Sequence, residues 1–156
     1  MTVHVLDESP STDGAFGTAP DDRTLEQRLA SGFILVDKPA GPTSHQLAAW
    51  ARDLLGLERL GHGGTLDPFA TGVLPLMAGR CMKITNKILK HEKTYIAVLR
   101  FKSMPDMETL NATMATMTGR IYNVPPEVSA VKVQVRTRNV HTFELLDTDG
   151  NDAVVR

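Results

Sequence analysis

The chain has 156 residues, 42% of them hydrophobic, which is enough material for a domain with an apolar core. Its net charge of −1 argues against a strongly basic nucleic-acid binder, and its single cysteine, Cys81, excludes an internal disulfide and a cysteine-rich zinc site. No apolar run is long enough to span a membrane, and the N-terminus lacks a basic-then-apolar signal pattern, so we expect a cytoplasmic protein.

Charge and composition change along the chain. The first 31 residues hold six acidic side chains and two arginines, which leaves 15 basic and 12 acidic side chains in the remainder. Residues 1–24 are also rich in small and polar side chains, and such a segment buries too little apolar surface to order itself. We therefore expect residues 1–24 to be a disordered N-terminal extension, and residues 25–156 to form a mildly basic folded body.

Residues 25–56 show the patterns of a helix, a strand and a second helix. Residues 25–30 fit a short helix, and the apolar run 33–36 is typical of a buried strand. After a proline-rich loop, Thr43 or Ser44 can cap the second helix, which Gly56 ends. Helical spacing predicts that its buried face consists of Leu47, Trp50, Ala51, Leu54 and Leu55.

A glycine-rich turn follows. Gly61, Gly63 and Gly64 surround His62, and glycine allows either positive φ angles or close approach of the backbone to a ligand. The segment GHGGT lacks the GK[ST] ending of a nucleotide-binding P-loop, so a phosphate loop of that type is disfavoured.

Asp67 is the carboxylate of this turn. Pro68 restricts the backbone of the residue before it, so the Asp67 side chain leaves the main chain in a narrow range of directions. The apolar run 73–78 is typical of a buried strand, although Pro75 favours a sheet edge or a bulge. A lone Asp in a glycine-rich turn is more often a turn residue than a catalyst, so residue type alone does not assign it a role.

Residues 80–90 have two faces if they are helical. The basic face is typical of a solvated surface, but contacts to nucleic-acid phosphates require the same kind of stripe, and the charge pattern leaves both open. The apolar face contains Met77, Cys81, Ile84 and Ile88, and the basic face contains Arg80, Lys83, Lys87 and Lys90.

The last third of the chain alternates strands with one helix. Residues 95–101 fit a strand, and Asp106 can cap a helix whose inward side chains would be Met107, Leu110, Met114 and Met117. Strict alternation predicts a strand in which Val131, Val133 and Val135 oppose Lys132, Gln134 and Arg136, and a further alternation at His141, Phe143 and Leu145. Asp149-Gly150 predicts a hairpin turn, and a return strand from residue 153 suggests a truncated chain.

Four segments together carry a resemblance to a known family. Residues 36–44 read VDKPAGPTS, residues 61–74 read GHGGTLDPFATGVL, residues 93–95 read KTY, and residues 119–132 read GRIYNVPPEVSAVK. In this order and spacing they resemble the motifs of the pseudouridine synthases of the TruB and dyskerin type, from about residue 31 to the end of the chain. The resemblance implies an α+β fold with a mixed, largely antiparallel sheet and packed helices.

The resemblance also implies an activity, the isomerisation of uridine in RNA. The matching aspartate is the essential carboxylate of the family, so Asp67 would either attack C1′ or remove the proton at C2′, without a metal or an organic cofactor. Tyr95 would stack on the flipped uracil, and His62 would touch RNA beside it. Lys38 would support the structure of the site. Arg80, Lys83, Lys87 and Lys90 would contact the RNA backbone, with Arg136 and Arg138 as weaker candidates.

Some features of the chain depart from the family pattern. The Gly-Thr-Tyr-x-Arg segment, whose arginine pairs with the catalytic aspartate, and the RNA-binding PUA domain are both absent from the 156 residues. Residues 123–126 and 132–133 are more typical of the bacterial branch, whereas the short 100–119 interval, the N-terminal extension and residues 136–138 favour the archaeal dyskerin homologues. We predict the archaeal branch.

The archaeal branch implies particular substrates and partners. Its members are the catalytic subunits of box H/ACA guide-RNA particles, so the resemblance implies a guide RNA and small accessory proteins as partners, and ribosomal RNA or the TΨC loop of tRNA as substrates. Two alternatives are a stand-alone tRNA pseudouridine synthase of bacterial type and a truncated RNA-binding fragment without catalysis. Tritium release from RNA labelled at C5 of uridine separates an enzyme from a binder.

Overall fold

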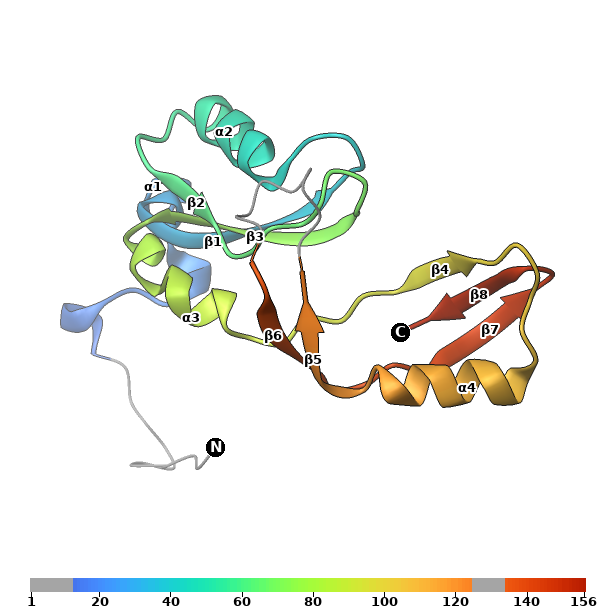
Figure 1. The fold of residues 1–156 in the computed structure, drawn as a ribbon. Helices are drawn as coiled ribbons and strands as arrows, with labels where there is room; N and C mark the ends of the chain where they lie inside the picture. Colours follow the sequence, from blue (N-terminus) through green and yellow to red (C-terminus); the bar gives the residue numbers. More distant parts are fainter. Residues whose placement is uncertain (1–12, 125–133) are drawn as a thin grey trace. The chain divides into compact units, whose positions relative to one another are not determined.

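The structure is a computed structural model that describes residues 13–124 and 134–156 (Figure 1). Contacts within the chain divide it into two compact units, residues 1–91 and 92–156, a boundary that the sequence patterns did not indicate. The elements of the first unit are η1 (Gly14–Phe16), η2 (Pro20–Asp22), α1 (Leu25–Ala30), β1 (Ser31–Lys38), α2 (Ser44–Leu54), β2 (Leu60–His62), β3 (Gly72–Gly79), η3 (Arg80–Ile84) and α3 (Thr85–Leu89). Those of the second are β4 (Ala97–Arg100), α4 (Met107–Thr116), β5 (Gly119–Asn123), β6 (Arg136–Val140), β7 (Leu145–Asp149) and β8 (Asp152–Val155).

The predicted α+β class is confirmed. Every strand pair among the described residues is antiparallel, and the strands form two three-stranded sheets and one two-stranded ribbon rather than a single sheet. Within the first 24 residues, positions 13–24 contain only the two short 3₁₀ helices, and the remainder of the predicted extension lies outside the described residues.

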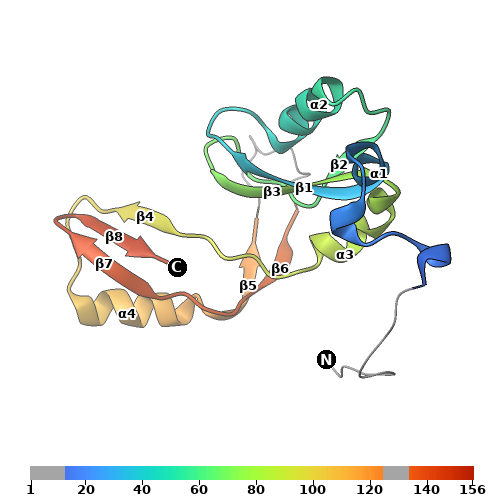
Figure 2. The same ribbon diagram turned by 180° about the vertical axis from the view of Figure 1, so that it is seen from behind.

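The first unit is built on a sheet with the strand order β1-β3-β2. β1 and β3 pair over eight residues without a break, from Ser31 opposite Gly79 to Lys38 opposite Gly72. α2 lies on one face of this sheet and α3 on the other (Figures 1 and 2). Beneath α2 the core consists of the buried residues Ala48, Leu74 and Leu76 and the partly buried residues Ile34, Val36, Leu47, Ala51, Leu60 and Leu66.

Pro75 lies in the central strand of this sheet, so the predicted edge or bulge is wrong. The Pro75 carbonyl accepts a hydrogen bond from the Gly63 amide at 2.8 Å, on the side of β3 that faces β2. The N–H and C=O of a residue in an antiparallel ladder point to the same neighbouring strand, so the N–H that Pro75 lacks would also face β2. The Gly63 bond is therefore the last of this ladder, and β2 ends at His62, opposite Leu76. Proline is therefore accommodated in the central strand at the point where the ladder to β2 ends.

α2 begins where the sequence predicts. The Thr43 hydroxyl accepts a hydrogen bond from the Gln46 amide, and the Gln46 side chain accepts one from the Thr43 amide, which is a complete capping box. The predicted apolar face is wrong in part, because Trp50 is 58% exposed and Leu54 is 87% exposed. Small side chains face the sheet instead and allow α2 to approach it closely. The inner positions are Ser44, Leu47, Ala48 and Ala51.

The segment after β3 is a 3₁₀ helix followed by a short α-helix, not the single helix that two faces would require. A 3₁₀ helix has three residues per turn and an α-helix has 3.6, so the residues that point inward differ from those expected for a single α-helix. Ile84 is therefore 42% exposed, whereas Met82 and Thr85 are partly buried beside Cys81 and Ile88. The predicted basic side chains are all exposed, and we call them the basic stripe: Arg80, Lys83, Lys87 and Lys90.

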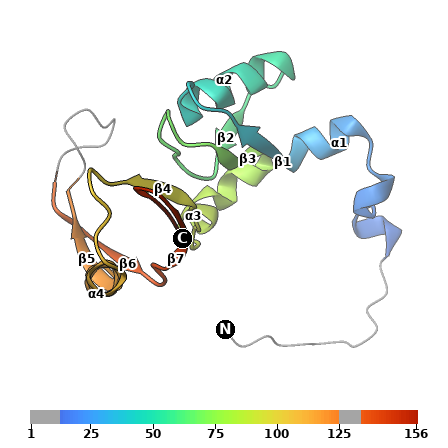
Figure 3. The same cartoon turned by 90° about the vertical axis from the view of Figure 1, so that its right-hand side faces the viewer.

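The second unit has a sheet with the order β4-β8-β7, and α4 packs against one face of it (Figure 3). The predicted inward positions of α4 are confirmed for Leu110 and Met114, but Met107 and Met117 are 43% and 49% exposed. The sheet is narrow, so only the central turns of α4 pack against it. The core consists of Leu110, Met114, Ala153 and Val155, with Leu99, Phe101, Met104, Phe143 and Leu145 packed around it.

β5 and β6 form a separate antiparallel ribbon, in register from Gly119 opposite Val140 to Asn123 opposite Arg136. The predicted alternation at Val131 and Val133 lies outside the described residues. The predicted hairpin is confirmed: β7 and β8 pair around a turn at Gly150, whose φ angle is +56°.

Asp106 caps α4, and this cap gives the unit a pH dependence that can be measured. Its carboxylate accepts hydrogen bonds from the amide and the hydroxyl of Thr109, both at 2.8 Å, and these bonds lower the pKa of Asp106 below its ordinary value of 3.8. Since the folded-state pKa is lowered, the cap contributes stability above about pH 4, and the contribution is lost as the pH falls below that value.

We expect Asp106→Asn to weaken this acid sensitivity, because asparagine keeps an acceptor for the Thr109 amide but cannot be protonated there. The measurement is the urea concentration at which α4 is half unfolded, followed through the amide resonances of α4 at pH 7 and at pH 3. The midpoint should fall further in the parent than in the variant. Equal falls in the two proteins would contradict the prediction.

Candidate functional site

Asp67 lies in the loop that connects β2 to β3, and its side chain is exposed. A tight turn follows, in which the Ala70 amide donates to the Asp67 carbonyl at 3.0 Å. Within residues 13–124 and 134–156, no side chain or backbone group forms a hydrogen bond or ion pair with the Asp67 carboxylate. The direction of the carboxylate therefore depends on the backbone that carries it.

Lys38 holds the downstream side of this turn. Its side chain is fully buried, and its ammonium group lies 3.2 Å from the Asp67 carbonyl oxygen, 3.3 Å from that of Pro68 and 2.8 Å from that of Ala70. A fourth carbonyl, that of Pro39, accepts at 3.0 Å. An ammonium has three protons, so the four acceptors exceed its donors and the buried charge is fully solvated by carbonyl dipoles.

Ser44 holds the upstream side. It is 1% exposed and occupies the first position of α2, where Thr43 already provides the cap. Its hydroxyl accepts a hydrogen bond from the Leu66 amide at 2.9 Å and donates one to the Leu66 carbonyl at 3.2 Å. The Ser44 hydroxyl thus satisfies the backbone amide and carbonyl of Leu66, as a neighbouring strand would in a sheet.

A third bond joins the same two segments through the backbone. The Gly41 amide donates to the Pro68 carbonyl at 2.8 Å. Residues 38–44 therefore reach the Asp67 turn at three points, through Lys38, Gly41 and Ser44. The first motif of the sequence and the aspartate motif are one structural assembly, although more than 20 residues separate them.

His62 ends β2 and is partly buried. Its Nδ1 atom is hydrogen-bonded to the Gly64 carbonyl, so in the neutral ring Nδ1 carries the proton and Nε2 keeps the lone pair. The ring of His45, in the first turn of α2, meets the His62 ring edge to face, with 6.5 Å between the centroids and 76° between the planes. The two imidazoles thus form a pair on the first unit.

The glycines of this turn do not adopt unusual backbone angles, and at Gly63 the absence of a side chain serves packing. Gly61, Gly63 and Gly64 all lack positive φ, so that predicted alternative is wrong. A Cβ atom on Gly63 would lie 2.6 Å from Ile88 and 3.0 Å from Pro75, which is too close for any side chain. The backbone at Gly63 therefore lies close to side chains of the protein itself, whereas the sequence suggested close approach to a ligand.

The remaining predicted residues lie elsewhere. Tyr95 belongs to the second unit, just before β4, and is 51% exposed. The basic stripe belongs to the first unit, as do Asp67, His62 and Lys38. The residue pattern did not indicate the contacts of Ser44 or the pairing of His45 with His62. Ser44 resembled a helix cap, and its burial was not visible in the residue pattern.

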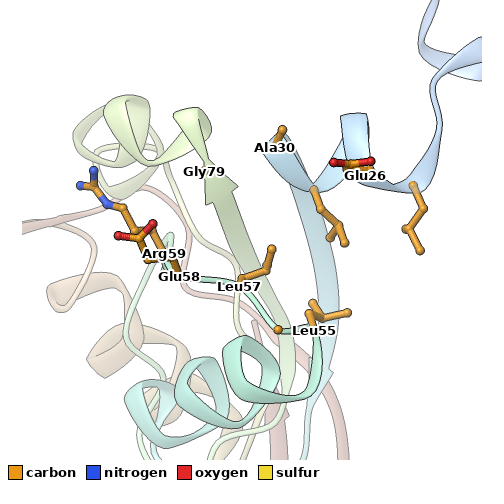
Figure 4. Close-up of a pocket in the computed structure, with 10 residues that line it drawn as sticks. Glu26, Ala30, Leu55, Leu57, Glu58, Arg59 and Gly79 are labelled. Atoms are coloured by element: carbon orange, nitrogen blue, oxygen red, sulfur yellow. The ribbon is translucent and has the colours of Figure 1, made fainter.

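An open groove of about 650 Å³ lies on the first unit between α1 and the connection from α2 to β2 (Figure 4). It contains none of the predicted site residues; its lining is Leu25, Glu26, Leu29, Ala30, Leu55, Gly56, Leu57, Glu58, Arg59 and Gly79. In the part of the chain that the structure describes, no three His, Cys, Asp or Glu side chains are grouped to hold a metal ion. The described helices are also all too short or too polar to cross a membrane.

Comparison with known proteins decides the family. Residues 52–145 match the TruB family pseudouridylate synthase (N terminal domain), and residues 4–48 match the DKCLD (NUC011) domain. The chain belongs to the TruB pseudouridylate synthase family. The match includes the Asp67 turn, and the additional DKCLD match supports the archaeal dyskerin type within the family.

Relatives of this TruB-family chain include archaeal proteins. A "Probable tRNA pseudouridine synthase B" of Pyrobaculum calidifontis is 43% identical over 145 residues, covering 93% of the chain and 44% of the relative. The protein of the same name from Pyrococcus abyssi is 40% identical over 154 residues, covering 99% of the chain and 46% of the relative. The chain thus spans less than half the length of these curated relatives.

Solved structures agree with this assignment. The crystal structure of a Cbf5-Nop10-Gar1 complex contains a chain that is 37% identical, with a TM-score of 0.81 over 96% of this chain and 45% of that one. An H/ACA RNP bound to a substrate RNA containing 2′-deoxyuridine contains one that is 33% identical, with a TM-score of 0.80 over 96% and 44%. The fold of this chain is therefore that of the pseudouridine synthases.

Lys38→Met tests how strongly the buried ammonium holds the Asp67 turn. Methionine keeps the length of the side chain but leaves several carbonyl oxygens without a donor, so we expect the first unit to lose roughly 3 kcal/mol of unfolding free energy. Lys83→Met, the same change at an exposed position of that unit, should cost less than about 0.5 kcal/mol. Urea unfolding measures both, and equal losses would contradict a special role for Lys38.

Proposed function

We propose that this TruB-family protein isomerises uridine to pseudouridine in RNA, with Asp67 as the catalytic carboxylate. The observation that carries the proposal is an exposed carboxylate on a turn whose backbone is bonded on both sides by buried side chains, Lys38 and Ser44. A reacting group needs such support, because a misplacement of about 1 Å can cost on the order of 100-fold in rate.

The proposed reaction breaks the bond between C1′ and N1 of the uridine and forms a bond between C1′ and C5. C5 loses a proton and N1 gains one, so the product is an isomer and no oxidant or cofactor is needed. C1′ becomes electron-poor as its bond to N1 breaks, and a carboxylate at Asp67 stabilises this centre by charge or by direct addition. The exposed side chain of Asp67 is open to an RNA substrate.

Tyr95 and His62 are proposed to bind the substrate around the flipped uridine. Tyr95 is half exposed, so part of its side chain is accessible to a base, and an aromatic ring is the group on which flipped bases stack. His62 has a tautomer set by the Gly64 carbonyl, which leaves Nε2 as the nitrogen that can contact RNA.

The basic stripe is proposed to bind RNA phosphates. Arg80 and Lys83 are one 3₁₀ turn apart in η3, and Lys87 and Lys90 lie three residues apart at the end of α3. All four side chains are exposed, and no ion pair joins them to other described residues. Charges in this state are available for phosphate contacts.

The proposed substrates and partners follow from the relatives. Relatives are named as tRNA pseudouridine synthases, and solved ones occur with Nop10, Gar1 and H/ACA RNA particles. We propose that the gene product modifies ribosomal RNA with a guide RNA, or the TΨC loop of tRNA directly, together with small accessory proteins. Its proposed location is the cytoplasm.

Asp67→Asn tests the reaction. Asparagine has nearly the same shape but cannot act as a carboxylate, so tritium release from RNA labelled at C5 of uridine should fall by at least about 1,000-fold. RNA retention on filters should stay within about threefold of the parent, because the charge contacts remain. The protein should be tested as its gene encodes it.

Asp53→Asn is the matched control, an exposed acid of the same unit outside the site, and should release tritium at the parental rate. A parent that retains RNA but releases no tritium would support a non-catalytic RNA-binding protein instead. Full release by Asp67→Asn would refute the role of Asp67.

The basic stripe is tested by Lys83→Ala with Lys87→Ala. The logarithm of the RNA association constant falls linearly with the logarithm of the salt concentration. Each lost phosphate contact should make this slope less steep by about 0.7 to 0.9, so the pair should make it less steep by roughly 1.5. Arg52→Ala with Arg59→Ala removes the same charge from other positions of the unit, the partly buried Arg52 and the exposed Arg59, and should leave the slope close to the parental value. Equal slopes for the two double variants would show that only net charge matters.

A further inference from the structure

Ser44 has a hydroxyl whose placement the capping of α2 does not explain. Thr43 and Gln46 complete the capping box, so α2 needs no further side-chain acceptor at its start. The Ser44 side chain instead turns into the protein, where it is 1% exposed and makes both of its hydrogen bonds to Leu66.

These two bonds act on the peptide that leads into Asp67. The Leu66 carbonyl belongs to the peptide plane between Leu66 and Asp67, and Ser44 holds this plane. The Asp67 carbonyl belongs to the next plane, which Lys38 holds at 3.2 Å. The φ and ψ angles of a residue are the rotations between its two flanking planes, so holding both planes sets the direction of the Asp67 Cα–Cβ bond.

We propose that Ser44 is a positioning residue for the Asp67 carboxylate: it fixes the upstream peptide plane, as Lys38 fixes the downstream one. This inference rests on the proposed function of Asp67. The Asp67 side chain has no partner of its own among the described residues, so the backbone is what aims it. Loss of the Ser44 hydroxyl frees the upstream plane and spreads the carboxylate over directions that miss C1′.

The test is single-turnover tritium release with the gene product in excess over RNA labelled at C5 of uridine. This measurement separates the rate constant of the reaction from its amplitude, which reports the active fraction. We expect Ser44→Ala to lower the rate constant by about 10-fold or more, with RNA affinity within about twofold of the parent. Ser44→Thr keeps a hydroxyl at the same atom and should recover most of the rate.

Ala48→Gly is the matched control. Ala48 lies on the same face of α2, is 4% exposed, and makes no hydrogen bond to the Asp67 turn, although Leu66 packs against the core cluster that contains it. Glycine there destabilises α2 by about 1 kcal/mol, so the active fraction can fall while the rate constant should not. A Ser44→Ala rate constant within twofold of the parent overturns the proposal. Equal slowing by Ala48→Gly, or no recovery in Ser44→Thr, also overturns it.

Failure of this inference can be told apart from failure of the proposed function. If the parent releases no tritium, or releases it equally well as Asp67→Asn, the proposed function fails. If release depends on Asp67 but the rate constant does not depend on Ser44, only the positioning role fails.

Discussion

The buried ammonium of Lys38 is the interaction on which the Asp67 turn depends. A charge inside a protein must be paired or surrounded by polar groups, and here four backbone carbonyls surround it at 2.8 to 3.3 Å. Carbonyl dipoles satisfy the ammonium without adding a full negative charge beside the Asp67 carboxylate, which a glutamate or aspartate partner would do. Three of the four carbonyls belong to residues 67–70, so the loop is tied to the end of β1 by a single side chain.

Strand register explains how Lys38 reaches this loop. β1 pairs with β3 over its whole length, and Lys38, its last residue, lies opposite Gly72, the first residue of β3. The loop that carries Asp67 enters β3 at Gly72, so pairing of the two strands brings the lysine beside the last residues of the loop. α2 then starts from the same end of β1 and brings Ser44 to Leu66. A sheet and the first turn of a helix thus converge on one short segment.

The residues proposed to act in one reaction are divided between two compact units. Asp67, His62 and the basic stripe lie in the first, and Tyr95 lies in the second, just before the edge strand β4. Each unit has its own core, around Leu74 and Leu76 in one and around Leu110 and Ala153 in the other. Support of the carboxylate and presentation of the aromatic ring therefore have separate structural origins within the chain.

The sequence by itself determined the local features of this protein. Thr43 and Asp106 start their helices, Gly56 and Gly150 sit at the predicted helix end and hairpin, and the motif around Asp67 indicates the family. These features depend on neighbours within a few residues, so their patterns are visible along the chain. Only the tertiary structure decided which strand is central, which side of α2 is buried, and that the Ser44 hydroxyl serves Leu66. Each of these depends on contacts between segments far apart in the sequence, where a partner strand ends or how closely a helix approaches, and no local pattern encodes those distances.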